Sequence, residues 1–108
     1  MSAFPLITRT ELETITSQPG IVLLDFWQAG CAPCRALEPR LERFAGAHPG
    51  AFKGYRIDVD TEPALAAGFN VMSIPTIVVL QDGHETSRLD GLICDVDLHA
   101  IIALHTGA

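Results

Sequence analysis

The sequence predicts one α/β domain over residues 1–108, in which a mixed β-sheet has helices on both faces. Three observations lead to this fold class. Of the 108 residues, 48% are hydrophobic and 19% are charged, which excludes a disordered chain and provides enough apolar surface for a compact core. Strand and helix patterns alternate in the order βαβαβαββα, as in a layered fold. A turn between the last two strands makes that pair antiparallel, so the sheet is mixed.

The first elements lead into an apolar strand. Thr8 and Glu11 have the spacing of a capping box, which predicts a short helix that ends at residues 17–20, Ser-Gln-Pro-Gly. The run Ile21–Trp27 is apolar apart from Asp25. A run that is apolar on both faces is typical of a central strand covered on both sides.

A long amphipathic helix is predicted next. Its apolar residues recur at i, i+4, i+7 and i+8, with charged residues between them: Leu37, Leu41, Phe44 and Ala45. Pro39 lies inside this helix and removes one backbone hydrogen bond, so we expect a kink there. Residues Phe52–Val59 then predict a strand, and Glu62–Gly68 a short helix with Pro63 in its first turn.

The last third of the chain predicts a hairpin and a helix. Thr76–Leu80 is a β-branched strand, and Gln81–His84 forms a turn into a strand near Glu85–Leu89. Asp95 is the expected N-cap of the final helix. The apolar face of that helix is expected to hold Leu98, Ile101, Ile102 and Leu104.

Charge and hydropathy exclude several classes of partner. Seven basic and thirteen acidic side chains give a net charge of −6, which disfavours binding to nucleic acid or to an anionic membrane. No apolar stretch approaches the roughly 18 residues that span a bilayer. Residues before Thr8 lack the pattern of a signal peptide, so we expect a cytoplasmic protein, in which cysteines are mostly reduced.

Two of the three cysteines, Cys31 and Cys34, form a CxxC pair between the predicted central strand and the long helix. Such a pair in a reducing compartment indicates redox or metal chemistry. The surrounding residues resemble those of the thioredoxin family: residues 25–35 read DFWQAGCAPCR, followed by Pro39 and, much later, by residues 74–76, IPT. Together with the element order, this resemblance covers nearly the whole chain and is far more specific than a CxxC alone.

The resemblance implies a thioredoxin fold in which Cys31 is the attacking nucleophile and Cys34 resolves the mixed disulfide. A sulfur at a helix start lies near unpaired N–H groups and the positive end of the helix dipole, which stabilise a thiolate. Pro33 suits the first helical turn and stiffens the ring that the two sulfurs close. The alternative is half of a zinc or iron–sulfur site. A closed zinc site needs four ligands, and only Cys94 and scattered histidines remain, so we expect no metal.

Asp25 is an acid in an otherwise apolar strand. Burial would raise its pKa and make it a proton acceptor near neutral pH. By resemblance it relays the proton of Cys34 when that sulfur attacks the mixed disulfide. The alternative is an aspartate at a strand end, bonded to neighbouring backbone amides. We favour the catalytic role because the uncompensated burial of a charge costs several kcal/mol.

Pro75 begins a predicted strand, which by itself would mark only a strand start. The resemblance implies instead that the Ile74–Pro75 bond is cis and faces the disulfide. The backbone of Ile74 would then bind an extended substrate segment. By the same resemblance, Gly91 and Leu92 border the substrate groove.

The chain departs from the family pattern at three positions. Gly30 stands where thioredoxins usually carry Trp, which removes apolar contact area beside the nucleophile and should change the set of partners. Ala32 replaces the usual Gly and limits the freedom of the loop. Arg56 replaces a Lys near the buried acid, and we expect it to lower the pKa of Asp25 further than Lys would.

Cys94 is the third cysteine and precedes the final helix. We expect a small buried side chain; the alternative is a thiol that the helix N-terminus activates toward glutathionylation or an intermolecular bond.

These residues together predict a reductase of protein disulfides that has no bound cofactor, acts as a monomer, and is regenerated by a flavin-dependent or ferredoxin-dependent thioredoxin reductase. An oxidase or isomerase is the enzymatic alternative, and a redox potential would separate the two. The alternative from another class is a non-enzymatic binding module that docks a partner through Gly30, Ile74, Gly91 and Leu92.

Overall fold

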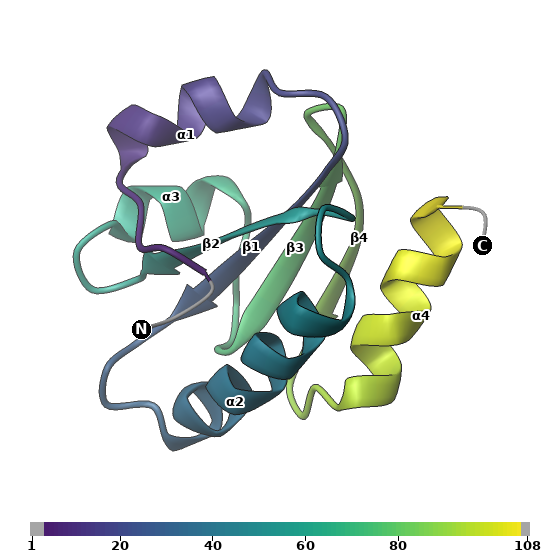
Figure 1. Ribbon diagram of the computed structural model, residues 1–108. Helices are drawn as coiled ribbons and strands as arrows, with labels where there is room; N and C mark the ends of the chain where they lie inside the picture. Colours follow the sequence, from purple (N-terminus) through teal and green to yellow (C-terminus); the bar gives the residue numbers. More distant parts are fainter. Residues whose placement is uncertain (1–3, 107–108) are drawn as a thin grey trace.

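The computed structural model describes residues 4–106, and their elements follow the order αβαβαββα (Figure 1). The strands are β1 (Ile21–Trp27), β2 (Lys53–Asp58), β3 (Thr76–Gln81) and β4 (His84–Asp90). The helices are α1 (Arg9–Thr16), α2 (Ala32–Ala47), α3 (Pro63–Gly68) and α4 (Asp95–Thr106). The predicted elements from α1 onward are therefore confirmed, with ends that move by one or two residues.

The sheet has the strand order β2-β1-β3-β4, with β1 and β2 parallel and the other two pairs antiparallel. The mixed sheet is confirmed, but the strand expected before the first helix is wrong. That segment makes one isolated parallel bridge, between Leu6 and Arg56. The Ile7 N–H donates to the Arg56 carbonyl at 2.9 Å, and the Arg56 N–H donates to the Pro5 carbonyl at 2.8 Å. Because Pro5 has no N–H, the ladder cannot extend further toward the N-terminus.

The helices cover both faces of the sheet, as Figure 1 shows: α1 and α3 lie on one side and α2 and α4 on the other. Alternate residues of β1 enter the two cores. Leu23 packs with residues of α2 and α4, and Leu24 and Phe26 pack with residues of α1 and α3. Because side chains alternate along a strand, Asp25 shares the face of Leu23 and is directed toward the side of α2. The central, doubly covered strand is confirmed.

Two details of α4 differ from the prediction. The Leu98 N–H donates to the carbonyl of Cys94 at 3.3 Å, so Cys94 rather than Asp95 is the N-cap. The Cys94 N–H in turn donates to Asp97 Oδ2 at 2.8 Å. Leu104 does not belong to the apolar face and is 74% exposed. At 100° per residue, position 104 points well to one side of the stripe that begins at Leu98.

The turn between β3 and β4 has positive φ at both central residues, 52° at Asp82 and 85° at Gly83, as a type I′ turn requires. Asp82 also fastens this turn to the start of β1. Its Oδ1 accepts from the Gly20 N–H at 2.7 Å, and its N–H donates to the Gly20 carbonyl at 3.0 Å. Beyond the turn, the pairing register shifts between Val79 and Leu80, which makes β4 irregular.

Replacing Gly83 with Ala should destabilise the fold by about 2 kcal/mol or more, because positive φ is unfavourable for Ala and its Cβ would collide with the Thr16 carbonyl oxygen. Gly46→Ala is the matched control. Gly46 lies within α2, and a Cβ there meets nothing within 4 Å. That variant should be about 0.5–1 kcal/mol more stable than the parent. Urea unfolding measures both, and equal effects would contradict the assignment of the turn.

Candidate active site

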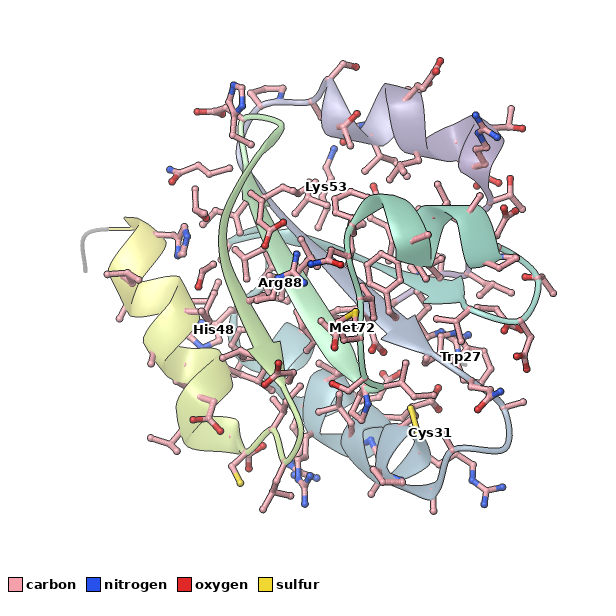
Figure 2. The ribbon with its side chains drawn as sticks, turned by 180° about the vertical axis from the view of Figure 1, so that it is seen from behind. Trp27, Cys31, His48, Lys53, Met72 and Arg88 are labelled. Carbon is pink, nitrogen blue, oxygen red and sulfur yellow. A yellow bond between two sulfur atoms is a disulfide. The ribbon has the colours of Figure 1, made fainter. Side chains whose placement is uncertain are left out.

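The cysteine pair lies at the N-terminus of α2, just beyond the end of β1. Cys31 is the N-cap of the helix, and its Sγ accepts a hydrogen bond from the Cys34 N–H at 3.2 Å. Pro33 lies in the first turn. The sulfur atoms form a disulfide with a Cα–Cα distance of 5.2 Å (Figure 2). The predicted position of the pair at a helix start is thus confirmed, and so is the ability of the two sulfurs to bond.

The two cysteines differ in exposure. Cys31 is half-buried, whereas Cys34 is only 2% exposed. A molecule approaching from solvent therefore meets Cys31 first. This asymmetry is what an attacking and a resolving cysteine require.

A groove of about 260 Å³ opens beside the disulfide. It is lined by Pro33, Ala36, Leu37, Arg40, Ile74, Pro75, Gly91, Leu92 and Ile93. Five of the residues proposed from the sequence are therefore brought together from three separate segments of the chain. Gly30 is exposed in the loop before Cys31, and Ala32 is exposed as the first residue of α2; neither residue lines the groove. The Ile74–Pro75 peptide bond is cis, as predicted.

Part of the groove is formed by residues that the sequence does not mark as functional. The amphipathic pattern puts Arg40 among the charged residues between the apolar positions, but its Nη1 donates to the Ile93 carbonyl at 3.1 Å and joins α2 to the segment that precedes α4. Leu37 belongs to the predicted apolar face of the long helix. Ile93 is not among the site residues that the sequence predicts. Arg40 lies six residues beyond Cys34, which puts it on a different side of the helix, so no local pattern connects the two.

A second hollow, of about 210 Å³, shares Ile74 with the groove and is lined in part by Met72. Met72 is 86% exposed and Leu92 is 79% exposed, so large apolar side chains border both hollows. Figure 2 labels Met72 and Cys31. The only sequence signal for Met72 is its place three residues before Pro75.

Asp25 is 1% exposed, and its Oδ1 has no hydrogen-bond partner among residues 4–106. Burial raises the pKa of its carboxyl from 3.8 to about 7; the charge of Arg56 acts against this shift, and the charge of Glu38 adds to it. The predicted buried acid with a raised pKa is confirmed. The missing partner on Oδ1 also argues against a carboxylate satisfied by backbone amides.

Arg56 is the Cα partner of Asp25 on the neighbouring strand, yet its ion pair is with Glu38, at 2.7 Å between Nη1 and Oε1. Its Nε donates to the Phe4 carbonyl at 2.8 Å, and its Cζ lies 4.9 Å from the centroid of the Trp27 ring. Arg56 therefore lowers the pKa of Asp25, as expected, but burial outweighs it. The comparison with Lys at this position stays a prediction.

In the sequence, Glu38 is one of the charged residues between the apolar positions of the amphipathic helix. It stands four residues after Cys34, which places the two on the same side of α2. That spacing was the available signal.

Cys94 is half-buried at the start of α4. Its exposure is therefore intermediate between that of the buried side chain we expect and that of the accessible thiol of the alternative. Among residues 4–106, no group of three or more His, Cys, Asp or Glu side chains is arranged to hold a metal ion. No helix in the same part of the chain is long and apolar enough to cross a membrane.

Comparisons with known proteins agree with this geometry. The family model described as Thioredoxin matches residues 5–103. The chain is similar to the thioredoxin of Staphylococcus saprophyticus, with 40% identity over 88 residues that cover 82% of this chain and 85% of that protein. It is 35% identical to a thioredoxin of Staphylococcus aureus over the same extents. Among solved structures, it is similar to a mutant thioredoxin from Halobacterium salinarum NRC-1, with a TM-score of 0.85, 33% identity, and coverage of 98% of this chain and 95% of that one.

The matched region contains the sheet, the cysteine pair and the groove, so it includes every residue on which the sequence resemblance was based. The prediction of an oxidoreductase, rather than of a non-enzymatic docking module, is confirmed. The chain belongs to the thioredoxin family and is a thiol–disulfide oxidoreductase, a protein-disulfide reductase whose redox pair is Cys31–Cys34.

Proposed function

We propose that this reductase acts on extended segments of cytoplasmic proteins, as a monomer, and receives its electrons from a flavin-dependent or ferredoxin-dependent thioredoxin reductase. The observation that carries the proposal is the apolar groove at the start of α2, whose lining includes Pro33, the residue two positions after Cys31. The Cys31–Cys34 pair itself carries the two electrons, so the reaction needs no bound cofactor.

In the first step, the thiolate of Cys31 attacks one sulfur of a substrate disulfide. The substrate S–S bond breaks, a mixed disulfide forms, and the second substrate sulfur leaves as a thiolate that takes a proton from water. The N-terminus of α2 favours this step because its N–H groups stabilise negative charge on Cys31. The Cys34 N–H already donates to that sulfur in the oxidised state.

In the second step, Cys34 gives its proton to the Asp25 carboxylate, and its sulfur attacks the sulfur of Cys31. The Cys31–Cys34 bond forms, the mixed disulfide breaks, and the remaining substrate sulfur leaves as a thiolate. Cys34 is only 2% exposed, which limits the contact of its sulfur with bulk water. A carboxyl whose pKa is raised to about 7 can both accept and release a proton near neutral pH.

The substrate chain lies in the groove, where the backbone at Ile74 and Pro75 pairs with it as a short strand would. Leu92, which also lines the groove, contributes apolar contact with the substrate. With Gly30 in place of a large aromatic residue, these contacts carry more of the affinity for the substrate.

The test is reduction of insulin disulfides with electrons supplied by each class of reductase. Leu92→Ser should lower kcat/KM for insulin about three- to tenfold, because an apolar contact is lost, and should leave the reduction of a small aromatic disulfide unchanged. Leu104→Ser is the matched control, since Leu104 is 74% exposed and does not line the groove. Equal losses in the two variants, or no turnover with either reductase, would contradict the proposal.

A further inference from the structure

The Arg56 guanidinium is fixed by contacts from three separate parts of the chain. Glu38 of α2 accepts from Nη1 at 2.7 Å, the Phe4 carbonyl accepts from Nε at 2.8 Å, and the Trp27 ring lies 4.9 Å from Cζ. These are the interactions that a planar guanidinium favours: it pairs with a carboxylate, donates a hydrogen bond from a second nitrogen, and lies over an aromatic ring.

The strand register would otherwise favour a different partner for this cation. Asp25 and Arg56 are Cα partners on parallel strands, so their side chains leave the same face of the sheet side by side. Yet the described part of the chain has no ion pair between them, and Asp25 Oδ1 is buried without a hydrogen bond. Glu38 therefore occupies the guanidinium that Asp25 would be expected to bind.

We propose that Glu38 is a positioning residue for the resolving step: by binding Arg56, it keeps that cation from pairing with Asp25 and leaves the Asp25 carboxyl able to take the proton of Cys34. The proposal rests on the proton-transfer role proposed above for Asp25. An Asp25–Arg56 ion pair would hold the carboxylate in its charged form and make it a weaker base.

The other groups around Asp25 do not supply this effect. On this face of the sheet, side-chain alternation puts Asp58 beside Arg56 on β2, and Glu38 of α2 reaches Arg56 through its ion pair. On β3, the residue opposite Asp25 is the apolar Ile77. Of the charged groups, Arg56 lowers the pKa of Asp25 and Glu38 raises it. Removing the Glu38 charge should therefore lower this pKa directly, and freeing Arg56 to approach Asp25 should lower it again.

The decisive measurement is the titration of the Asp25 carboxyl carbon by NMR in the oxidised protein. In Glu38→Gln, the midpoint should fall from about 7 by about one pH unit or more, a tenfold change in proton affinity. Glu42→Gln removes the same charge from an exposed position one turn further along α2 and should leave the midpoint within about 0.3 units. An unchanged midpoint in Glu38→Gln would overturn the proposal.

A double substitution tests whether Glu38 acts through Arg56. In an Arg56→Gln background, Glu38→Gln should lower the midpoint by less than half of its effect in the parent, because no guanidinium is left to release. A full-sized effect in that background would mean that Glu38 acts by its charge alone, and it would overturn the positioning role. Glu38 is 37% exposed in its side chain, so the single variant should fold.

Kinetics separate this proposal from the role of Asp25 itself. A mixed disulfide made with an activated peptide thiol reports the rate at which Cys34 releases the peptide. The pH of half-maximal release should fall in Glu38→Gln by the same amount as the NMR midpoint, and Asp25→Asn should lose that inflection. If Glu38→Gln shifts the NMR midpoint but Asp25→Asn retains the inflection, the proton-transfer role fails while the positioning of Arg56 stands.

Discussion

The Cys31→Ser variant should reduce insulin disulfides no faster than the small-molecule reductant does without protein. A serine hydroxyl is almost wholly protonated at neutral pH, and the helix N-terminus that stabilises a thiolate cannot make it an effective nucleophile. We propose this role for Cys31 because it is the N-cap of α2 and the more exposed of the two cysteines. Turbidity from precipitating insulin chains measures the rate.

Cys34→Ser is the companion variant and should fail differently. Its Cys31 can still attack, but nothing resolves the product, so a mixed disulfide with the substrate should accumulate and appear by mass spectrometry as a one-to-one adduct. Cys94→Ser should behave as the parent, because Cys94 does not line the groove. Adducts on Cys31→Ser that require Cys34 would reverse the assignment of the two roles.

The Asp25→Asn variant should be more stable than the parent at pH 8, and its advantage should shrink as the pH falls. The folded protein raises the pKa of Asp25 from 3.8 to about 7 through burial, so the fold binds this proton more tightly than the unfolded chain does. The stability contributed by the protonated form is complete below about pH 4 and is lost as the pH rises through about 7. Asn carries no such proton.

The difference in the free energy of unfolding between the variant and the parent should therefore grow by about 4 kcal/mol from about pH 4 to pH 8. Urea unfolding at a series of pH values measures it, with Glu42→Gln as the control for loss of one exposed carboxylate. A difference that does not change with pH would show that the Asp25 carboxyl titrates alike in the folded and unfolded chains. The proton-transfer role proposed for Asp25 would then lose the raised pKa on which it depends.

Local patterns were sufficient to predict the layered fold. The apolar run of β1, the Asp-Gly turn and the spacing of α2 each depend on neighbouring residues, and each formed as expected. The strand expected before α1 depended instead on pairing across the sheet, and Pro5 limits that pairing to one bridge. Leu104 and the N-cap of α4 were misplaced because hydrophobicity alone does not fix where a helix stripe ends.

The site was predicted less completely, for a related reason. Cys31, Cys34, Asp25 and Pro75 stand in a recognisable pattern, and the structure puts them at the start of α2, in β1 and beside the groove. Glu38 and Arg40 fit the polar side of an amphipathic helix, and nothing local distinguishes a solvated charge from one that binds Arg56 or the Ile93 carbonyl. Those contacts join residues 18 and 53 positions apart, a separation at which sequence periodicity carries no information.

The irregular margins of the sheet have a consequence for how copies of the chain meet. A regular, exposed edge strand offers its backbone to the strand of a second molecule. Here one edge strand is β2, which is bridged by Leu6 at Arg56. The other edge strand is β4, whose pairing register with β3 shifts. Arg88 of β4 also forms an ion pair with Glu85 and donates to the Phe69 carbonyl. Edge-to-edge association would have to displace these groups, so the irregular margins protect the chain against aggregation.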